Sequence, residues 1–201
     1  GSVMRILRLL CALLFSSLLL MHNAVASSVG DFALLDQNGT FHQASYYSDH
    51  DAIVILAESS ETLAGERART AVFNIESVEQ SGKIKAFVIS PNSGVERDAL
   101  QAAVSALSTN LPVLIDETQL VSQSLDLSRY GEVVVINPKS LSVIYRGSTA
   151  DLKGITDFSA LSTSAASNTE PLGDSIEFRS SKAVSYVNDV APILERNCVT
   201  C

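Results

Sequence analysis

Three runs rich in apolar and β-branched residues constrain the fold of this chain more than any other feature. They are residues 52–57 (AIVILA), 85–90 (KAFVIS) and 132–137 (EVVVIN). Continuous apolar runs of this length are typical of strands that are buried on both faces. Residues 61–80 and 96–107 lie between these runs and place apolar side chains at the spacing of a helix. Strands that alternate with helices predict an α/β domain whose central sheet carries helices on both faces.

Shorter segments complete this domain. Residues 29–40 predict an extended segment followed by a turn at Asn38-Gly39, which is a strong hairpin signal. Residues 112–115 predict a short strand, and residues 118–127 predict a short helix. Residues 142–146 follow the third buried run after a loop of about four residues, which is too short for a parallel crossover. We therefore expect the last two strands to be antiparallel.

Residues 1–26 predict an export signal. Residues 1–3 precede the first methionine and are interpreted as extraneous. Arg5 and Arg8 form a positive start, residues 9–21 an apolar stretch, and residues 24–26 (AVA) a cleavage site. The apolar stretch is shorter than the roughly 20 residues of a membrane span, although an uncleaved N-terminal anchor stays open as the alternative. We expect a periplasmic or secreted protein with no stable membrane span after cleavage.

Charge and cysteine usage narrow the function classes. The formal net charge is -8, and removal of the two signal arginines makes the mature chain more acidic still. Nucleic-acid binding requires clustered Lys and Arg side chains, so we expect no nucleic-acid partner. Cys11 leaves with the signal, and only Cys198 and Cys201 remain. The domain must therefore depend on an ordinary hydrophobic core and not on disulfides.

The composition changes after the predicted domain. Residues 156–175 are rich in Ser and Thr and predict a flexible linker. Residues 176–201 predict the opening of a second unit. Within it a helix carries one apolar stripe, formed by Val187, Val190, Ile193 and Leu194.

The last four residues are Cys198-Val199-Thr200-Cys201. A Cys-x-x-Cys pair after such a helix is how a c-type haem attachment site begins, and a His directly after the second Cys then ligates the iron. No residue follows Cys201 in this sequence. We expect the chain to be the N-terminal piece of a longer protein, and we expect haem c only if a His comes next. The alternative is an incomplete site.

The motifs resemble a known family. The opening 29–39 (VGDFALLDQNG) is similar to the first strand and turn of the redoxin branch of thioredoxin-like proteins. Residues 111–118 (LPVLIDET) and 131–138 (GEVVVINP), closing on 145–147 (YRG), resemble a narrower group in which a redoxin domain precedes a c-type haem region and sometimes a copper monooxygenase-like module. The ending 184–201 is similar to the start of that haem region. The resemblance implies a thioredoxin-like domain over residues 27–155, with a central mixed sheet flanked by helices. It also implies the first helix of a truncated cytochrome c-like region.

The same comparison implies that the thiol site is absent. A redoxin carries its thiol after the second buried strand, where a helix N-terminus stabilises the thiolate. Here residues 57–65 (AESSETLAG) contain no cysteine, and Gly131 stands where the family has a cis-proline. Ser59 or Ser60 is interpreted as a helix N-cap, and the site region also includes Thr62. We therefore expect no thiol peroxidase or disulfide oxidoreductase activity from this chain, although the full-length protein can still be an oxidoreductase.

Other polar groups give weaker signals. His42 and His50 lie in a polar stretch and are interpreted as exposed, because a metal site needs three or four convergent ligands. The neighbouring polar residues in that stretch are Tyr46, Tyr47, Asp49 and Asp51. Asp116-Glu117, before Thr118, is interpreted as a helix cap. Four cations are interpreted as solvated surface charges: Arg67, Arg69, Lys83 and Lys85.

Three hypotheses for function follow. The first is an exported electron-transfer protein in which the redoxin-like domain is a docking or scaffold unit and Cys198 and Cys201 attach haem. Its partner is then a periplasmic redox protein or a downstream domain of the same chain. The second is a non-enzymatic binding module in which the Cys pair is incidental. The third is a dithiol or metal-binding site at Cys198 and Cys201, which the preceding helix disfavours because its negative end faces the pair.

Overall fold

The computed structural model describes residues 28–91, 97–154, 158 and 173–179. Along the chain the strands are β1 (Ala33–Leu35), β2 (Phe41–Gln43), β3 (Ala52–Ala57), β4 (Ile84–Ser90), β5 (Val113–Ile115), β6 (Glu132–Asn137) and β7 (Ser142–Ser148). The α-helices are α2 (Glu66–Glu79), α3 (Arg97–Leu107) and α4 (Leu120–Ser124). Short 3₁₀ helices are η2 (Ala44–Tyr47), η3 (Thr62–Ala64) and η4 (Thr149–Gly154).

The central sheet has the strand order β5-β4-β3-β6-β7. β3 pairs in parallel with β4, and β4 with β5, whereas β6 is antiparallel to both β3 and β7. Every residue of β3 is buried, as its uniform apolar run predicts. The α/β class with a central mixed sheet is therefore confirmed, and so is the antiparallel closing hairpin.

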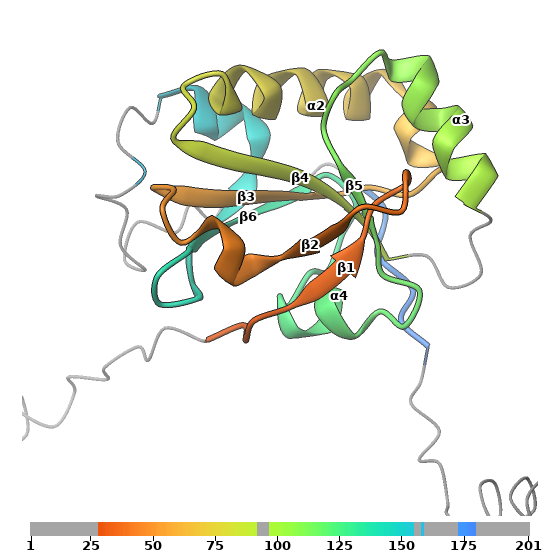
Figure 1. Cartoon of the computed structure of the whole chain (residues 1–201). Helices are drawn as coiled ribbons and strands as arrows, with labels where there is room; N and C mark the ends of the chain where they lie inside the picture. The colour runs from red at the N-terminus through yellow and green to blue at the C-terminus, as the bar shows by residue number, and fades with distance from the viewer. Residues whose placement is uncertain (1–27, 92–96, 155–157, 159–172, 180–201) are drawn as a thin grey trace, which may run out of the picture.

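The sheet has a layer on each face. Figure 1 shows α2 and α3 on one face, and the β1–β2 hairpin with α4 on the other. Alternate residues of β3 therefore point into two separate hydrophobic clusters. Val54 and Leu56 pack with α2 and α3, whereas Ile53 and Ile55 pack under the hairpin and α4.

The predicted hairpin at the start of the domain forms a two-stranded sheet of its own. Gly39 has φ +81°, which favours glycine. The Asp36 carboxylate accepts hydrogen bonds from the backbone N–H groups of Asn38 and Thr40, so it fixes the turn.

Two predicted helices have different bounds in the structure. The helix expected over 61–80 divides into η3 and α2, because Gly65 between them has extended backbone angles. The helix expected over 118–127 shrinks to α4, since Gln119 before it and Asp126 after it both have positive φ. No helix among the described residues is long and apolar enough to cross a membrane.

Two described residues beyond the predicted domain pack against it. Phe158 is buried in the α2 side of the core, and Ile176 is buried in the other cluster. The predicted boundary between linker and second unit, at 175–176, falls within a segment that hydrogen-bonds to the domain on both sides of it. The rest of the predicted linker, the signal at 1–26 and the segment 180–201 lie outside the described residues.

Candidate functional site

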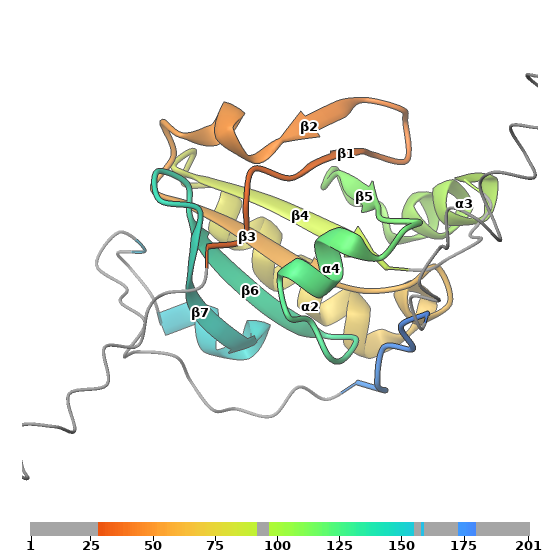
Figure 2. The ribbon, with the colours of Figure 1, turned by 90° about the horizontal axis from the view of Figure 1, so that it is seen from below.

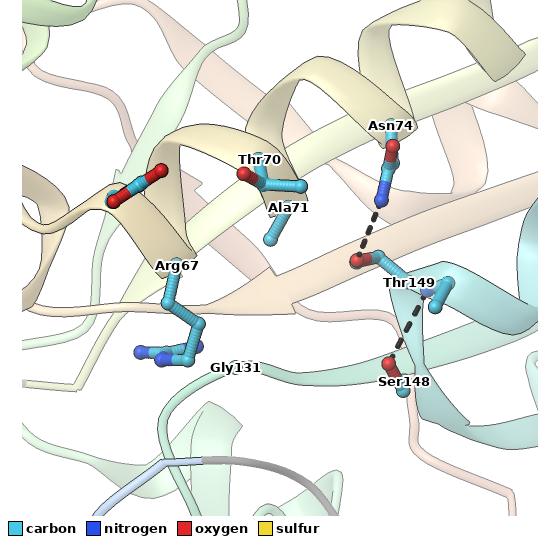
Figure 3. A pocket seen from close by; sticks show the side chains of 9 residues that line it. Arg67, Thr70, Ala71, Asn74, Gly131, Ser148 and Thr149 are labelled. Carbon is cyan, nitrogen blue, oxygen red and sulfur yellow. Dashed lines mark hydrogen bonds between the residues drawn. The ribbon is translucent and has the colours of Figure 1, made fainter.

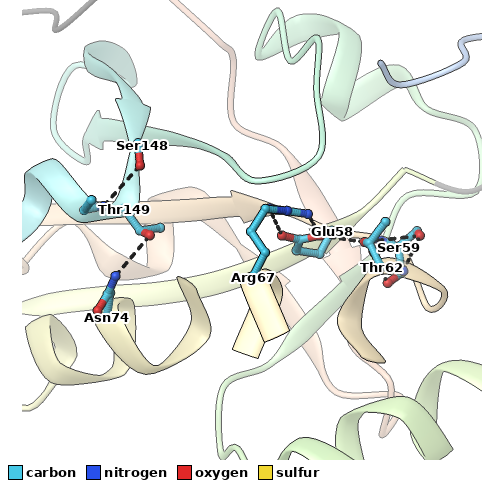
Figure 4. A network of polar contacts seen from close by, with 8 residues as sticks. Glu58, Ser59, Thr62, Arg67, Asn74, Ser148 and Thr149 are labelled. Atoms are coloured by element: carbon cyan, nitrogen blue, oxygen red, sulfur yellow. Dashed lines mark hydrogen bonds and ion pairs between the residues drawn. The ribbon is translucent and has the colours of Figure 1, made fainter. Parts of the chain in front are cut away.

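The residue directly after β3 is Glu58, and its side chain is 0% exposed. Arg67, in the first turn of α2, donates to it from both terminal nitrogens, from Nη1 to Oε1 at 2.8 Å and from Nη2 to Oε2 at 3.0 Å. Thr62 Oγ1 donates to Oε2 at 2.5 Å. Figure 4 shows these side chains converging between β3 and α2. Burial of a carboxylate is tolerated only when it is paired and hydrogen-bonded, and both conditions are met here.

Ser59 and Thr62 form the adjoining turn. Ser59 Oγ accepts from Thr62 N at 3.1 Å, and Thr62 Oγ1 accepts from Ser59 N at 2.8 Å. This reciprocal pair stabilises η3 and not the long helix, whose N-cap is Gly65 without a side-chain bond. The interpretation of Ser59 or Ser60 as the cap of the long helix was therefore wrong. The reason is that η3 and Gly65 separate the serines from the start of α2.

Gly131 lies against this ion pair. Its φ is +84°, and its N–H donates to Ala57 O at 2.7 Å. A β-carbon built on Gly131 would come within 2.0 Å of Arg67 Nη1 and within 3.0 Å of Arg67 Cζ. Only glycine therefore lets the guanidinium approach this loop so closely. The described backbone contains no cis peptide bond, so this loop differs from the cis-proline loop of the resembled family.

In the described part of the chain, the turn after β3 carries hydroxyl groups and no thiol. No cysteine occurs among the described residues. The hydrogen bonds of Ser59 Oγ in the described part of the chain are with Thr62, and none of them is with a histidine that could act as its base. A buried carboxylate at this point would also oppose a thiolate. Glu58 and Arg67 are thus a structural charge pair with one partly open side, since the Arg67 side chain is 32% exposed.

That open side faces a pocket of about 390 Å³. Figure 3 shows Arg67, Thr70 and Asn74 along one face of α2, opposite Gly131, Ser148 and Thr149. Asn74 Nδ2 donates to Thr149 Oγ1 at 3.3 Å, whereas Asn74 Oδ1 is buried and has no partner among the described residues. Polar and apolar atoms both line the pocket, and Arg67 of the charge pair is one of its lining residues, so it belongs to the same candidate site.

Tyr130, directly before Gly131, lies in an acidic environment. Burial raises the pKa of its phenol, and the negative charges of Glu61, Glu58 and Glu177 raise it further. Glu177 comes from the last described segment. The field therefore indicates that this segment, the loop around Gly131 and the end of β3 lie close together.

The two histidines that were predicted to be exposed lie in different environments. His42 was predicted to be exposed and is instead buried, with Nε2 3.0 Å from Asp36 Oδ2 and Nδ1 2.7 Å from Tyr47 Oη. The prediction failed because the polar stretch includes β2, whose inward position is His42. His50 is only half-buried and pairs with Asp49. No group of three or more His, Cys, Asp or Glu side chains suited to a metal was found in the described part of the chain.

The predictions for the remaining charged residues are confirmed for some of them and wrong for others. Asp116 is buried and accepts from Ser122 N and Oγ, both at 2.7 Å, so it caps α4, whereas Glu117 is exposed. Arg69 and Lys83 are exposed as expected. Arg67 is not the solvated charge that we expected, because it pairs with Glu58. Lys85 is not solvated either: it pairs with Glu79 at 2.8 Å and lies 5.2 Å from the Phe87 ring centroid.

The sequence analysis missed the Glu58–Arg67 pair. It also missed Asn74, which lines the pocket and hydrogen-bonds to Thr149. One signal was available for the first, because an acidic residue directly extends the buried run 52–57. Cys198 and Cys201 lie outside the described residues, so their haem attachment stays a prediction.

Comparison with known proteins gives structural relatives only. No family model matches this sequence, and no curated protein matches it. A hypothetical protein from Sinorhizobium meliloti is similar with a TM-score of 0.65 and 16% identity, over 77% of this chain and 94% of that one. An uncharacterised conserved protein from Geobacillus kaustophilus gives 0.54 and 17%, over 61% and 67%.

A third similar structure is a thiol-disulfide oxidoreductase from Bacteroides fragilis. Its TM-score is 0.51 at 14% identity, over 59% of this chain and 88% of that one. Identities this low show the fold and not the chemistry. The chain therefore has the thioredoxin-like fold, with the ion pair of Glu58 and Arg67 at the end of β3, where the resemblance places a thiol.

Proposed function

We propose that this chain is the front part of an exported electron-transfer protein whose thioredoxin-like domain is a docking unit without thiol chemistry. Cys198 and Cys201 then begin the covalent haem c site of that protein. The observation that carries the first half is the fully buried Glu58, bound at 2.8 Å by Arg67 in place of a thiol. The second half rests on the Cys-x-x-Cys pair alone.

The ion pair supports a docking role for a physical reason. A thiolate at this position requires positive potential from a helix N-terminus. Here the first turn of α2 supplies Arg67, and the Glu58 carboxylate already neutralises it. The Glu58 carboxylate therefore offsets the positive charge of Arg67 inside the domain, which weakens the effect of that charge on an incoming or introduced thiol. The domain keeps the shape of the fold without this chemistry.

Haem c, when bound, supplies an iron that exchanges single electrons with a partner. The residues of this chain that would hold it are Cys198 and Cys201, through thioether bonds. The described domain contributes an acidic, folded unit before this site. An acidic surface complements a basic redox partner.

The first experiment tests the docking half. The mature protein should reduce neither insulin disulfides nor hydrogen peroxide above the uncatalysed rate. A Ser59→Cys variant, which keeps the Glu58–Arg67 pair, should stay inactive in the same assays, because Gly131 stands where the resembled family has its cis-proline and Glu58 still neutralises Arg67. Turnover by the unmodified protein would refute the docking proposal.

The second experiment tests the haem half. The native reading frame is sequenced beyond Cys201 and expressed with the c-type haem maturation machinery. We expect a His codon next, and a pyridine haemochrome spectrum that survives denaturation of the protein. Cys198→Ser and Cys201→Ser should each remove a thioether bond and change the haemochrome band. A stop codon, or a haem that is lost on denaturation, would overturn this half.

A further inference from the structure

Residues 173–179, here called the strap, are bound to the domain through backbone hydrogen bonds and one isolated β-bridge. Tyr130 N donates to Asp174 O at 3.0 Å, and Ile176 N donates to Ser128 O at 2.8 Å. Arg129 and Ser175 form an antiparallel bridge between these two bonds. The strap therefore pairs with the loop that leads directly into Gly131. Figure 2 shows it in blue at the end of the sheet where η3 and α2 begin.

The strap also has a strand-like alternation of side chains. Ile176 is 6% exposed and packs in the core cluster under α4, whereas Glu177 is exposed. Phe178 packs against the same cluster. Burial of alternate apolar side chains stabilises a segment that pairs through its backbone.

Gln119 fixes the far end of the strap. Its buried amide donates from Nε2 to Pro91 O at 2.6 Å and to Glu177 O at 2.9 Å, and its Oε1 accepts from Arg179 N at 2.9 Å. Both ends of one side-chain amide are thus satisfied by the loop after β4 and by the strap. Gln119 reaches this position with φ +60°, a conformation that costs energy in any residue other than glycine.

The strap determines where the next part of the chain starts. Arg179, the last described residue of the strap, lies beside Gln119, and the next residue along the chain from Gln119, Leu120, is 65% exposed. Residues 180–185 can then extend at most about 20 Å. Residues 186–197, with their predicted apolar stripe, therefore start within about this distance of Arg179, which is bound to Gln119, the residue before Leu120.

The strap also shortens the tether. If residues 159–186 were one free coil, its mean end-to-end distance would be about 30 Å, whereas residues 180–186 alone give about 15 Å. The shorter tether raises the local concentration of the Cys-bearing segment at the α4 edge several-fold.

We propose that residues 186–201 dock in cis on the edge formed by α4 and the strap, with their apolar stripe over Leu120. Cys198 and Cys201 are then held against the domain, at the same end of the sheet as Glu58 and Gly131. This inference rests on the proposed function for the role of the two cysteines, but the docking itself does not require haem.

Proximity can be measured with the cysteines of the chain. The mature protein, uniformly labelled with ¹⁵N and carrying Cys198→Ser, receives a nitroxide on Cys201. We expect loss of amide intensity at α4 and the strap, relative to the ascorbate-reduced sample. Amides of the β1–β2 hairpin and of η4 should keep their intensity.

Two pairs of variants test whether docking depends on Leu120 and on the anchoring of the strap by Gln119. Leu120→Glu should restore the α4 intensities, whereas Phe73→Glu, at an equally exposed residue (64%) on α2, should not. Gln119→Ala should restore them too, whereas Gln101→Ala, which removes only a 3.5 Å contact to Asn38, should not. The amides of β3 and β6 report whether each variant is folded.

Even broadening over the whole domain, no broadening at α4, or identical spectra for Leu120→Glu and Phe73→Glu would each overturn the proposal. A chain that never attaches haem but still shows local broadening refutes only the haem half of the proposed function. A chain that attaches haem without local broadening refutes only the docking.

Discussion

Substitution of Arg67 by Met removes the positive partner of a carboxylate that has no access to solvent. Glu58 is 0% exposed, and its other side-chain contact is the Thr62 hydroxyl. Loss of one partner of a buried ion pair costs about 3–5 kcal/mol, because an uncompensated charge remains. The Arg67 side chain is one-third exposed, so water can partly replace it. We therefore expect a loss of about 3 kcal/mol in the free energy of unfolding, at the lower end of that range.

The assay is urea unfolding followed by circular dichroism, with the slope compared to confirm that only stability changed. Arg69→Met, on the same helix but exposed, is the matched control and should change stability by less than about 0.5 kcal/mol. The double variant Glu58→Leu with Arg67→Met removes both charges, so it should be more stable than Arg67→Met alone. A loss below about 1 kcal/mol for Arg67→Met would show that Glu58 is not a charged, buried partner, and would refute the reasoning.

Three further outcomes follow from single side chains. Gly131→Ala should lower the free energy of unfolding, measured by thermal melts, by about 3 kcal/mol, because the added methyl group displaces the Arg67 guanidinium and the positive φ is strained for alanine. Gly39→Ala, which has only the strain of a positive φ, should lower it by about 1 kcal/mol. Burial, together with a nearby carboxylate, raises the pKa of Tyr145. Its contribution to stability is therefore complete below the ordinary tyrosine value and declines at higher pH. The loss of stability between about pH 8 and pH 11 should be smaller in Tyr145→Phe. Asp116→Ala should cost about 2 kcal/mol in urea unfolding, because it leaves the start of α4 without its cap, whereas Glu117→Ala should be neutral.

The sheet was predictable because its signal is local. Residues 52–57 and 132–137 are continuous apolar runs, and both are strands with the same bounds in the structure. The Asn38-Gly39 turn was predictable for a similar reason, since one glycine with positive φ determines the hairpin. Helix ends were less predictable. Gly65 and Gln119 set them through backbone angles that apolar spacing does not encode.

The polar contacts were not predictable from local pattern. Glu58 and Arg67 are nine residues apart and meet only because η3 and Gly65 turn the chain between them. His42 looked exposed among polar neighbours, yet the pairing of β2 with β1 turns it inward toward Asp36. In each case tertiary packing decided which polar side chain is buried.

The pairing of the strap with the domain was not predicted, because the composition of this region indicated a linker. Residues 173–179 follow a Ser/Thr-rich stretch, and the composition of that whole stretch was the basis for predicting a linker. The alternation of Ile176 and Phe178 around Glu177 was the available signal, but two apolar residues are too few to predict a strand. The strap pairs with a loop and not with a strand of the central sheet. The sequence of residues 128–130 therefore carries no strand pattern that could have predicted the pairing.

The ion pair and the strap meet at one loop. Arg67 lies against Gly131 on one side, and on the other side the three residues before Gly131 pair with the strap. Gly131 N–H in turn donates to Ala57 O, one residue before Glu58. A buried ion pair is a weak source of stability when compared with apolar residues of the same size. Its value here is positional, because a guanidinium held at two points by Glu58 sets the path of the Gly131 loop. The loop then presents Tyr130 N and Ser128 O in the spacing that the strap requires. The charge pair at the end of β3 therefore positions the loop with which residues 173–179 pair.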